Sequence, residues 1–212
     1  MSCLKDKYIN KIANIGISRA TAENLVEAVE DQKSIESLFD GIGYLEEQAI
    51  EILTDFHHEF AVAKFETLQK EKLYVDMDGV LADFDRAMKN KNDYQKKEAK
   101  RKKGFFLNLK PIDGALEAFE ELSNHYNVFI LSTPSWSSEH SWSEKKQWVE
   151  KHLGKYGYKK LILTHDKSIF SGAALIDDRT VNGASDFQGE FIQFGSKKFP
   201  DWKSVLKHLI KN

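Results

Sequence analysis

Two patterns of hydrophobic positions follow one another along the chain. Before about residue 70, apolar residues recur every three or four positions, a spacing that predicts helices with one buried face. Glycines at Gly16 and at Gly41-Ile42-Gly43 interrupt this pattern, and no proline occurs before Pro111 to break a helix. The first part of the chain is therefore expected to form several short helices.

After residue 70 the pattern changes to short runs rich in β-branched and aromatic residues, which are typical of strands. Five such runs are separated by helix-like stretches, and they cover residues 73–75, 127–131, 161–163, 174–176 and 191–194. Helices are expected over 113–125, 143–153 and 201–210. This alternation favours a mostly parallel α/β sheet with helices on both faces.

Charge divides the chain at the same place. Residues 1–70 hold 7 basic and 13 acidic side chains, a net charge of −6, whereas the remaining 142 residues hold 24 basic and 20 acidic ones, a net charge of +4. The full 212 residues, 41% of them hydrophobic, suffice for one ordinary domain and a small second one. We expect a small all-α domain over residues 1–70 and an α/β domain over 71–212.

The composition also excludes several classes of protein. The longest apolar runs, such as residues 128–131, are far shorter than the roughly 20 residues that span a bilayer. The single cysteine, Cys3, forms neither an internal disulfide nor a four-cysteine zinc site, and the polar first residues lack the apolar stretch of a secretory signal. We therefore expect a cytoplasmic protein without a membrane partner.

A basic segment follows the first predicted strand. Residues 86–103 contain nine basic and two acidic side chains, a net charge of +7. Its position predicts a short helical insertion, or cap, over about residues 85–104. Such a charge attracts long polyanions as well as small anions, although a solvated lysine-rich helix is the simpler alternative.

Carboxylates follow two of the predicted strands. Asp76 and Asp78 come directly after the first strand, and Asp177 and Asp178 follow the run 174–176. Ligand sites in open α/β sheets lie beyond the carboxyl ends of the strands, so these four side chains are expected to converge. Close carboxylates repel one another and either take up protons or share a hard cation. Oxygen ligands without cysteine or histidine favour Mg²⁺ over zinc.

Two hydroxyls, Ser132 and Thr133, follow the predicted strand 127–131 and are expected at the same edge of the sheet. With a metal present, a phosphate can approach the carboxylates. One aspartate can then attack phosphorus while a neighbour moves protons and a lysine balances the charge on the oxygens. The residue types at these strand ends therefore point to phosphoryl-transfer chemistry.

Four segments resemble motifs of the haloacid dehalogenase superfamily, in the form found in the 5'(3')-deoxyribonucleotidases. They are Asp76-Met77-Asp78-Gly79-Val80-Leu81-Ala82-Asp83-Phe84, Ser132-Thr133-Pro134, the segment around Lys145, and Ile176-Asp177-Asp178-Arg179. Residues 105–112 and 163–167 also look like this family. The resemblance implies a Rossmann-type, three-layer parallel sheet with a short helical cap.

The resemblance also implies roles for single residues. Asp76 would be the nucleophile that forms an aspartyl phosphate, and Asp78 would protonate the leaving oxygen and later activate water. Ser132, Thr133 and Lys145 would bind the substrate, with Ser132 and Lys145 holding the transferring phosphoryl group.

A metal site is implied by the same motifs. Mg²⁺ would lie between the Asp76 side chain, the Asp78 main-chain carbonyl and a carboxylate of Asp177 or Asp178. Which of these last two is the direct ligand stays open.

Aromatic side chains and a second lysine are further candidates for the site. In the family, aromatic residues at the positions of Phe84 and Phe106 flank the base, and a flat ring is suited to hold one. Trp136 and Trp142 lie in a polar loop after the second motif and are candidates to line the site. Lys167 competes with Lys145 for the role of the third-motif lysine.

Taken with the motifs, the resemblance predicts a Mg²⁺-dependent phosphatase of (deoxy)nucleoside 5'- or 3'-monophosphates, with a small nucleotide as its partner. The short basic cap supports an alternative, a phosphatase of polynucleotide ends. A third alternative is another small phosphomonoester, with the N-terminal domain targeting the enzyme. As a partner, nucleic acid is less favoured than a small nucleotide.

The N-terminal domain carries two glycine turns, in residues 15–22 and 39–43, that resemble degenerate helix-hairpin-helix motifs. Such turns present backbone N–H groups to a DNA phosphate. The net charge of −6 opposes binding to DNA, so we expect this domain to contact a protein partner or a second copy of the chain.

Overall fold

The computed structural model describes residues 2–31 and 46–210. The chain divides into two compact units, residues 1–69 (unit 1) and residues 70–212 (unit 2). In the described part of the chain, none of the helices combines the length and the apolar character that a membrane crossing requires.

Unit 1 contains the helices α1 (Ser2–Asn14), α2 (Arg19–Glu30) and α3 (Glu46–Gln69). Buried apolar side chains from all three helices form one cluster, as the three-to-four spacing predicts. Gly16, at φ 98°, lies in the turn before α2, and Ser18 caps that helix by accepting a hydrogen bond from Thr21 N. The second predicted glycine turn, residues 39–43, lies outside the described residues.

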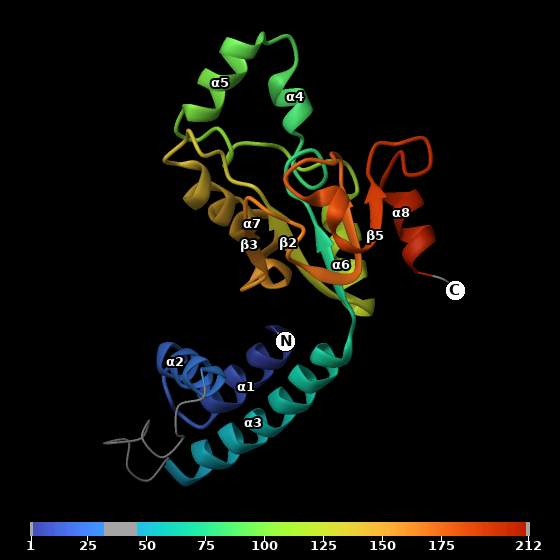
Figure 1. Ribbon diagram of the computed structural model, residues 1–212. Coiled ribbons are helices and arrows are strands. Elements are labelled where there is room, and N and C mark those ends of the chain that lie inside the picture. Colours follow the sequence, from blue (N-terminus) through green and yellow to red (C-terminus); the bar gives the residue numbers. More distant parts are fainter. Residues whose placement is uncertain (1, 32–45, 211–212) are drawn as a thin grey trace. The chain divides into compact units, whose positions relative to one another are not determined.

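Unit 2 is built on a five-stranded sheet in which every neighbouring pair of strands is parallel (Figure 1). Its strands are β1 (Lys72–Val75), β2 (Asn127–Ser132), β3 (Leu161–Leu163), β4 (Ser171–Asp177) and β5 (Gln188–Gln193). The spatial order β3-β2-β1-β4-β5 places β1 at the centre of the sheet, between β2 and β4. The order of the strands therefore reverses at β1, where open parallel sheets form a crevice.

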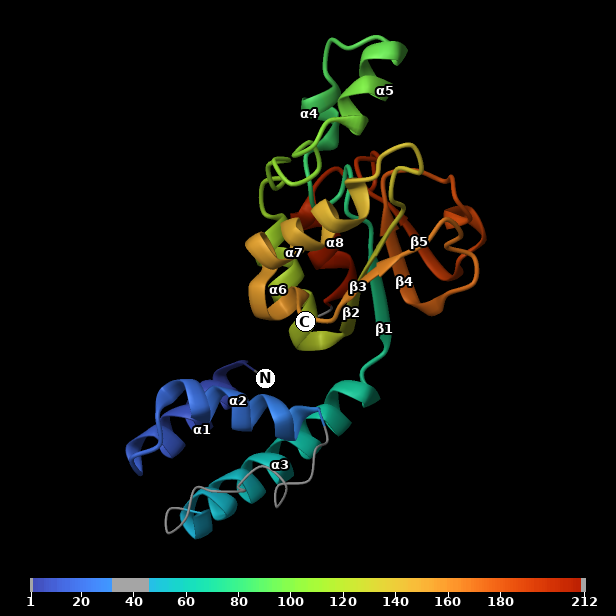
Figure 2. The same cartoon turned by 90° about the vertical axis from the view of Figure 1, so that its left-hand side faces the viewer.

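Three long helices cover one face of this sheet (Figure 2). They are α6 (Ala115–His125), α7 (Ser141–Gly157) and α8 (Trp202–Leu209), and their apolar side chains join those of alternate strand residues in one core. Among the described residues of unit 2, the other face is covered by the short 3₁₀ helix η3 (Ala184–Asp186) and by loops.

The expectation of helices on both faces was therefore wrong for the second face, as far as unit 2 is described. The connections on that face, residues 164–170 and 178–187, are too short to hold a helix of ordinary length. Aromatic side chains close the face instead. Tyr74 lies at its centre and contacts the rings of Phe129, Phe170 and Phe187 at centroid distances of 5.9, 5.6 and 5.6 Å.

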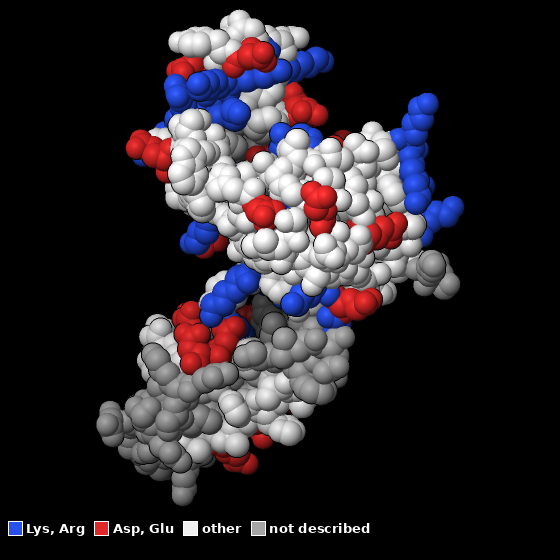
Figure 3. Space-filling model, in the orientation of Figure 1, with Lys and Arg blue, Asp and Glu red and all other residues white. Residues whose placement is uncertain are grey.

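The segment expected to be a cap is helical. It forms α4 (Phe84–Met88) and α5 (Asp93–Arg101), which lie beyond the carboxyl ends of the strands (Figure 1). Asn92 begins α5 with a capping box, in which Gln95 N donates to Asn92 Oδ1 (2.9 Å) and Asn92 N donates to Gln95 Oε1 (3.0 Å). Lysine and arginine side chains gather over these helices (Figure 3).

The two ends of the cap are held together at its base. Asp83 N donates to the Lys110 carbonyl (2.7 Å), and Ile112 N donates to the Leu81 carbonyl (2.9 Å). We call this pair of backbone hydrogen bonds the neck. It closes the insertion before the chain continues into α6.

A buried carboxylate fixes the chain where it returns from the cap. Glu144, in the first turn of α7, accepts hydrogen bonds from Gly104 N and from Phe106 N, the latter at 3.0 Å. Gly104 has a φ of 86°, a conformation that glycine adopts without strain. Glu144 therefore ties the returning segment to the helix that carries Lys145.

Replacing Glu144 by alanine is expected to lower the free energy of unfolding of unit 2 by about 2 to 4 kcal/mol, because a buried and a part-buried N–H group lose their acceptor. The matched control is Glu150→Ala on the same helix, where an exposed pair with Lys146 is lost, and this change should cost less than about 0.5 kcal/mol. Urea unfolding of both variants measures the difference. Equal losses in the two variants would contradict this role of Glu144.

Candidate active site

The carboxyl edge of the sheet brings the expected strand-end residues together. Asp76 directly follows β1, Ser132 ends β2 and Asp177 ends β4. Because β1 pairs in register with β2 on one side and with β4 on the other, these three positions are neighbours. The hydrogen bond from Asp76 N to the Ile176 carbonyl (2.8 Å) continues the pairing of β1 and β4 to this edge.

A cavity of about 220 Å³ opens at this edge, and its wall is almost entirely polar. It is lined by Asp76, Asp78, Ser132, Thr133, Lys167, Asp177, Arg179, Val181 and Asn182. Five of the residues predicted from the motifs therefore share one cavity. Its lining of carboxylates, hydroxyls and a lysine suits a phosphate group and a metal ion.

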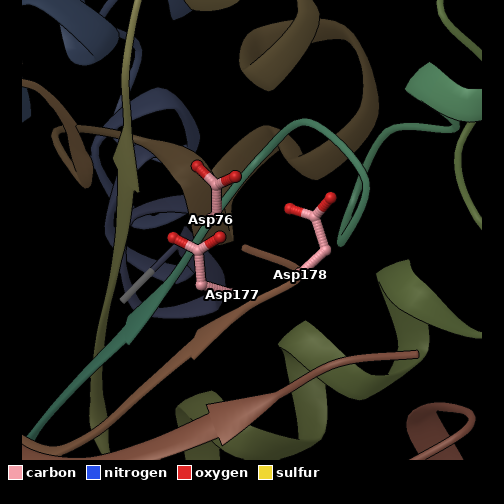
Figure 4. A group of neighbouring side chains, drawn as sticks. All are labelled: Asp76, Asp177 and Asp178. Atoms are coloured by element: carbon pink, nitrogen blue, oxygen red, sulfur yellow. The ribbon is translucent and has the colours of Figure 1, made fainter. Parts of the chain in front are cut away.

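Three carboxylates form a compact group beside this cavity (Figure 4). Asp76, Asp177 and Asp178 each offer an oxygen atom within 4.8 Å of the others. Burial, together with the negative charge of Asp76, raises the pKa of Asp178 to about 7. The same two causes raise the pKa of Asp177. The group therefore carries more negative charge than its surroundings compensate.

The donor set of this group fits a hard divalent cation, because all three members are carboxylates. Asp177 already uses both oxygens: Oδ2 accepts from Lys167 and Oδ1 accepts from Arg179 N (2.9 Å). The buried Asp178 Oδ1 has no hydrogen-bond partner among the described residues, and the nearest cation, Arg179 Nε, is 3.7 Å away. Asp178 therefore has the more available oxygen of the two.

Lys145 occupies a different part of the site. Its fully buried Nζ donates to Asp78 Oδ2 (2.7 Å) and to Ser132 Oγ (2.9 Å). Burial raises the pKa of Asp78 although Lys145 opposes this shift, which is the direction that a proton donor requires. The Asp78 side chain thus faces Lys145 and does not join the group of three carboxylates.

Lys167 is the lysine that contacts Asp76. Its buried Nζ lies 2.9 Å from Asp76 Oδ1 and donates to Asp177 Oδ2 at 2.5 Å. Burial alone would lower the pKa of Lys167, but the two carboxylates outweigh it and hold that pKa above its usual value. The motifs of the sequence favour Lys145 as the third-motif lysine, with Lys167 as its competitor. Lys167 follows the strand 161–163 closely, and this position at the carboxyl edge of the sheet is the sequence feature that favours Lys167 as the lysine beside Asp76.

Besides Asp178 Oδ1, two polar atoms of the site are buried without a hydrogen-bond partner within the described part of the chain, Thr133 Oγ1 and Asp78 Oδ1. Buried polar groups without partners are costly, and at a site they indicate where a ligand or water binds. Both residues line the cavity. A tetrahedral oxyanion in the cavity would offer an acceptor to the Thr133 hydroxyl.

The two phenylalanines expected beside a base differ in their surroundings. Phe106 is only 1% exposed, with Lys145 Nζ 5.1 Å from its ring centroid and Phe105 packed edge-on at 5.0 Å. Its ring faces are covered by protein. Phe84 is half-buried and contacts Phe105 edge-on at 5.9 Å. Neither ring lines the cavity beside Asp76.

Comparison with known proteins agrees with the motifs. Residues 94–202 match the family model of the 5' nucleotidase, deoxy (pyrimidine), cytosolic type C proteins. A protein of Vibrio phage KVP40 that bears the provisional name 5'(3')-deoxyribonucleotidase is 44% identical over 153 residues, which cover 70% of this chain and 90% of the relative.

Two human proteins are also similar to the chain. The cytosolic-type 5'(3')-deoxyribonucleotidase is 31% identical over 169 residues, which cover 64% of this chain and 78% of the relative. The mitochondrial 5'(3')-deoxyribonucleotidase is 30% identical over 168 residues, which cover 64% of this chain and 69% of the relative.

Gly79 allows the Asp178 carboxylate to approach the loop after β1. Its φ is 83°, and a Cβ atom placed there would lie 2.5 Å from Asp178 Oδ2. The matched control is Gly195, which has a φ of 77° but nothing within 4 Å of a Cβ atom. The two glycines share the backbone conformation and differ in the contact with Asp178.

Gly79→Ala and Gly195→Ala are both expected to lose about 1 to 2 kcal/mol of stability from the left-handed backbone. Only Gly79→Ala should also displace Asp178. If the three carboxylates hold Mg²⁺, this variant should therefore bind it more weakly, by about tenfold or more. The rise of the unfolding temperature with Mg²⁺ concentration measures this affinity. An unchanged response to Mg²⁺ in Gly79→Ala would contradict the placement of the metal at Asp178.

Proposed function

The chain belongs to the 5'(3')-deoxyribonucleotidase family of phosphoric monoester hydrolases, and we propose that it hydrolyses deoxynucleoside 5'- or 3'-monophosphates. The observation that carries this proposal is that Asp76, Asp78 and the buried Lys167 line one polar cavity, while a second buried lysine, Lys145, is bonded to Asp78. A small cavity lined by these charged side chains suits the phosphate of a monoester whose remainder lies outside the cavity.

Asp76 is the nucleophile in this proposal. A carboxylate oxygen of Asp76 forms a bond to phosphorus while the bond between phosphorus and the ester oxygen of the nucleoside breaks, which leaves an aspartyl phosphate. Lys167, whose Nζ lies 2.9 Å from Asp76 Oδ1, would balance the negative charge on the equatorial phosphate oxygens. The Thr133 hydroxyl would donate a hydrogen bond to one of these oxygens.

Asp78 transfers the protons in both steps. In the first step its carboxylic acid protonates the departing nucleoside oxygen. In the second step its carboxylate takes a proton from water, the water oxygen bonds to phosphorus, and the bond from phosphorus to Asp76 breaks to release inorganic phosphate. Lys145 holds the Asp78 carboxyl against Ser132 and so fixes its position beside the reacting group.

We propose Mg²⁺ as the cofactor, held by Asp76 and Asp178, with Asp177 as a positioning residue that orients Lys167 and the backbone of Arg179. The unpartnered Asp178 Oδ1 supports the choice of Asp178 as the direct ligand. When bound, the ion would neutralise charge on the phosphate oxygens. The expected contact from the Asp78 main-chain carbonyl is part of the same proposal.

A phosphatase of polynucleotide ends is the second candidate, because the cap is strongly basic. A hollow of about 1150 Å³ on the cap is lined by Asp85, Arg86, Met88, Lys89, Asn90, Lys91 and Lys96. Four of these residues are positively charged, and Figure 3 shows the same concentration of lysine and arginine over α4 and α5. Such a surface attracts nucleic acid phosphates.

A role for unit 1 in contacting a protein partner or a second copy of the chain stays a prediction. A cytoplasmic location also stays a prediction.

The substitution Asp76→Asn is expected to reduce kcat by at least about a thousandfold, because the amide keeps the shape of the side chain but is a poor nucleophile. Phosphate release from a deoxynucleoside monophosphate, with Mg²⁺ or with EDTA, measures the effect. Circular dichroism checks that the fold is kept. The control, Asp113→Asn, changes an exposed aspartate before α6 and should leave turnover unchanged. Near-normal activity of Asp76→Asn would contradict the assignment.

A cap variant separates the two candidate substrates. Six basic residues are changed together to glutamine: Lys96, Lys97, Lys100, Arg101, Lys102 and Lys103. Because a mononucleotide offers a single phosphate that the cavity already binds, its kcat/KM should change by less than about threefold. An oligonucleotide end should be a poor substrate of both proteins. Strong, salt-sensitive turnover of 3'-phosphorylated oligonucleotides that is lost in the variant would favour the polynucleotide phosphatase instead.

A further inference from the structure

Three aromatic side chains gather beside the loops that carry the phosphate-binding residues, and one of them, Trp142, lies in the first turn of α7. Trp136 lies in the loop after β2, and His165 lies in the loop after β3. Their ring centroids are 5.3 Å apart at an interplanar angle of 74°, and the ring of Trp142 lies 5.9 Å from that of His165 at an angle of 61°. His165 therefore lies in edge contact with two indole rings.

The cluster is open to solvent in a way that is unusual for indole rings. Trp136 is 82% exposed and Trp142 is 41% exposed, and within the described part of the chain no other large apolar side chain is as exposed as Trp136. Tryptophan is usually largely buried, so an exposed ring beside a cavity indicates a surface that another molecule covers.

The chain places this ring close to the cavity. Trp136 comes three residues after Thr133, and His165 comes two residues before Lys167, and both of these partners line the cavity. Three residues span at most about 11 Å. The two loops are also joined at their bases, because Thr164 N donates to the Ser132 carbonyl (3.0 Å).

The cavity itself leaves no room for a nucleoside. Its volume of about 220 Å³ is lined mainly by charged and polar side chains, which suits the phosphate and a metal ion. The rest of the substrate must lie outside this cavity. Phe106, which the sequence predicted to flank a base, is covered by protein on both sides.

We propose that Trp136, supported by His165 and Trp142, is the surface on which the nucleobase of the substrate stacks. This inference rests on the proposed function and names the residue that would favour nucleotides over other phosphate esters. A base stacks on an indole through its flat face, which every nucleobase possesses, so the platform should accept purines and pyrimidines alike. The loop would thus recognise the presence of a base and not its identity.

The test compares a deoxynucleoside 5'-monophosphate with 2-deoxyribose 5-phosphate, which has the same sugar and phosphate but no base. Trp136→Ala should raise KM for the nucleotide about tenfold and leave kcat within twofold, with no change in either constant for the sugar phosphate. Trp136→Phe should restore most of the affinity for the nucleotide, because a flat ring returns. The same result is expected with a purine and with a pyrimidine.

The control variant is Tyr158→Ala. Tyr158 is an aromatic residue that is 46% exposed, and it precedes β3, at the opposite end of the sheet from the cavity. This variant should keep the constants of the unchanged protein for both substrates. Binding is also measured directly, in proteins that carry Asp76→Asn, from the quenching of tryptophan fluorescence by the nucleotide. Trp136→Ala should remove most of this quenching.

Several results would overturn the platform while leaving the proposed function intact. One is an unchanged nucleotide KM in Trp136→Ala, and another is an equal rise of KM for nucleotide and sugar phosphate. A larger loss with a 3'-phosphorylated oligonucleotide than with the mononucleotide would assign the indole to a neighbouring nucleotide and would also overturn it. If the unchanged protein hydrolyses neither small substrate, the proposed function itself fails.

Discussion

The site depends on holding several carboxylates together away from water. Asp76, Asp78 and Asp177 are buried, and like charges repel strongly where the surroundings are less polar than water. Lys145 and Lys167 make this arrangement possible, and each of them also joins separate elements of unit 2. Removal of one partner from a buried ion pair commonly costs about 3 to 5 kcal/mol, because the other charge is left unpaired. The two lysines and their aspartate partners, which are suited to the chemistry, therefore also stabilise the carboxyl edge of the sheet.

Much of this arrangement could be predicted from the sequence, because it follows from where strands end. An apolar run followed by a carboxylate or a hydroxyl is a local pattern, and parallel strands bring such ends to one edge. Asp76, Ser132 and Asp177 were placed together on this basis, and the structure brings them together. The five strands were also predicted near their observed positions, since their β-branched and aromatic runs differ clearly from the helical spacing around them.

Other features could not be predicted, because they depend on contacts between distant segments. Which lysine contacts Asp76 depends on how the loop after β3 folds back. The position of Lys167 after the predicted strand 161–163 places it near the carboxyl edge of the sheet, but the sequence around each lysine does not show which carboxylate it contacts. The burial of Phe106 depends on Glu144, which holds the returning cap segment against α7. The second face of the sheet was predicted wrongly for a similar reason. The short connections on this face cover it with aromatic rings that pack on Tyr74. Such connections do not show a helical period in the sequence.

The neck fixes the two points at which the cap leaves the sheet and returns to it. Two backbone hydrogen bonds, from Asp83 to Lys110 and from Ile112 to Leu81, fix the distance between the ends of the insertion whatever lies between them. The entropy of closing a flexible loop grows only with the logarithm of its length, by about 0.6 kcal/mol for each doubling. Caps of different size can therefore be exchanged on the same scaffold with little cost in folding. In protein engineering terms, the neck is a graft point at which substrate access can be redesigned while the reactive groups stay in place.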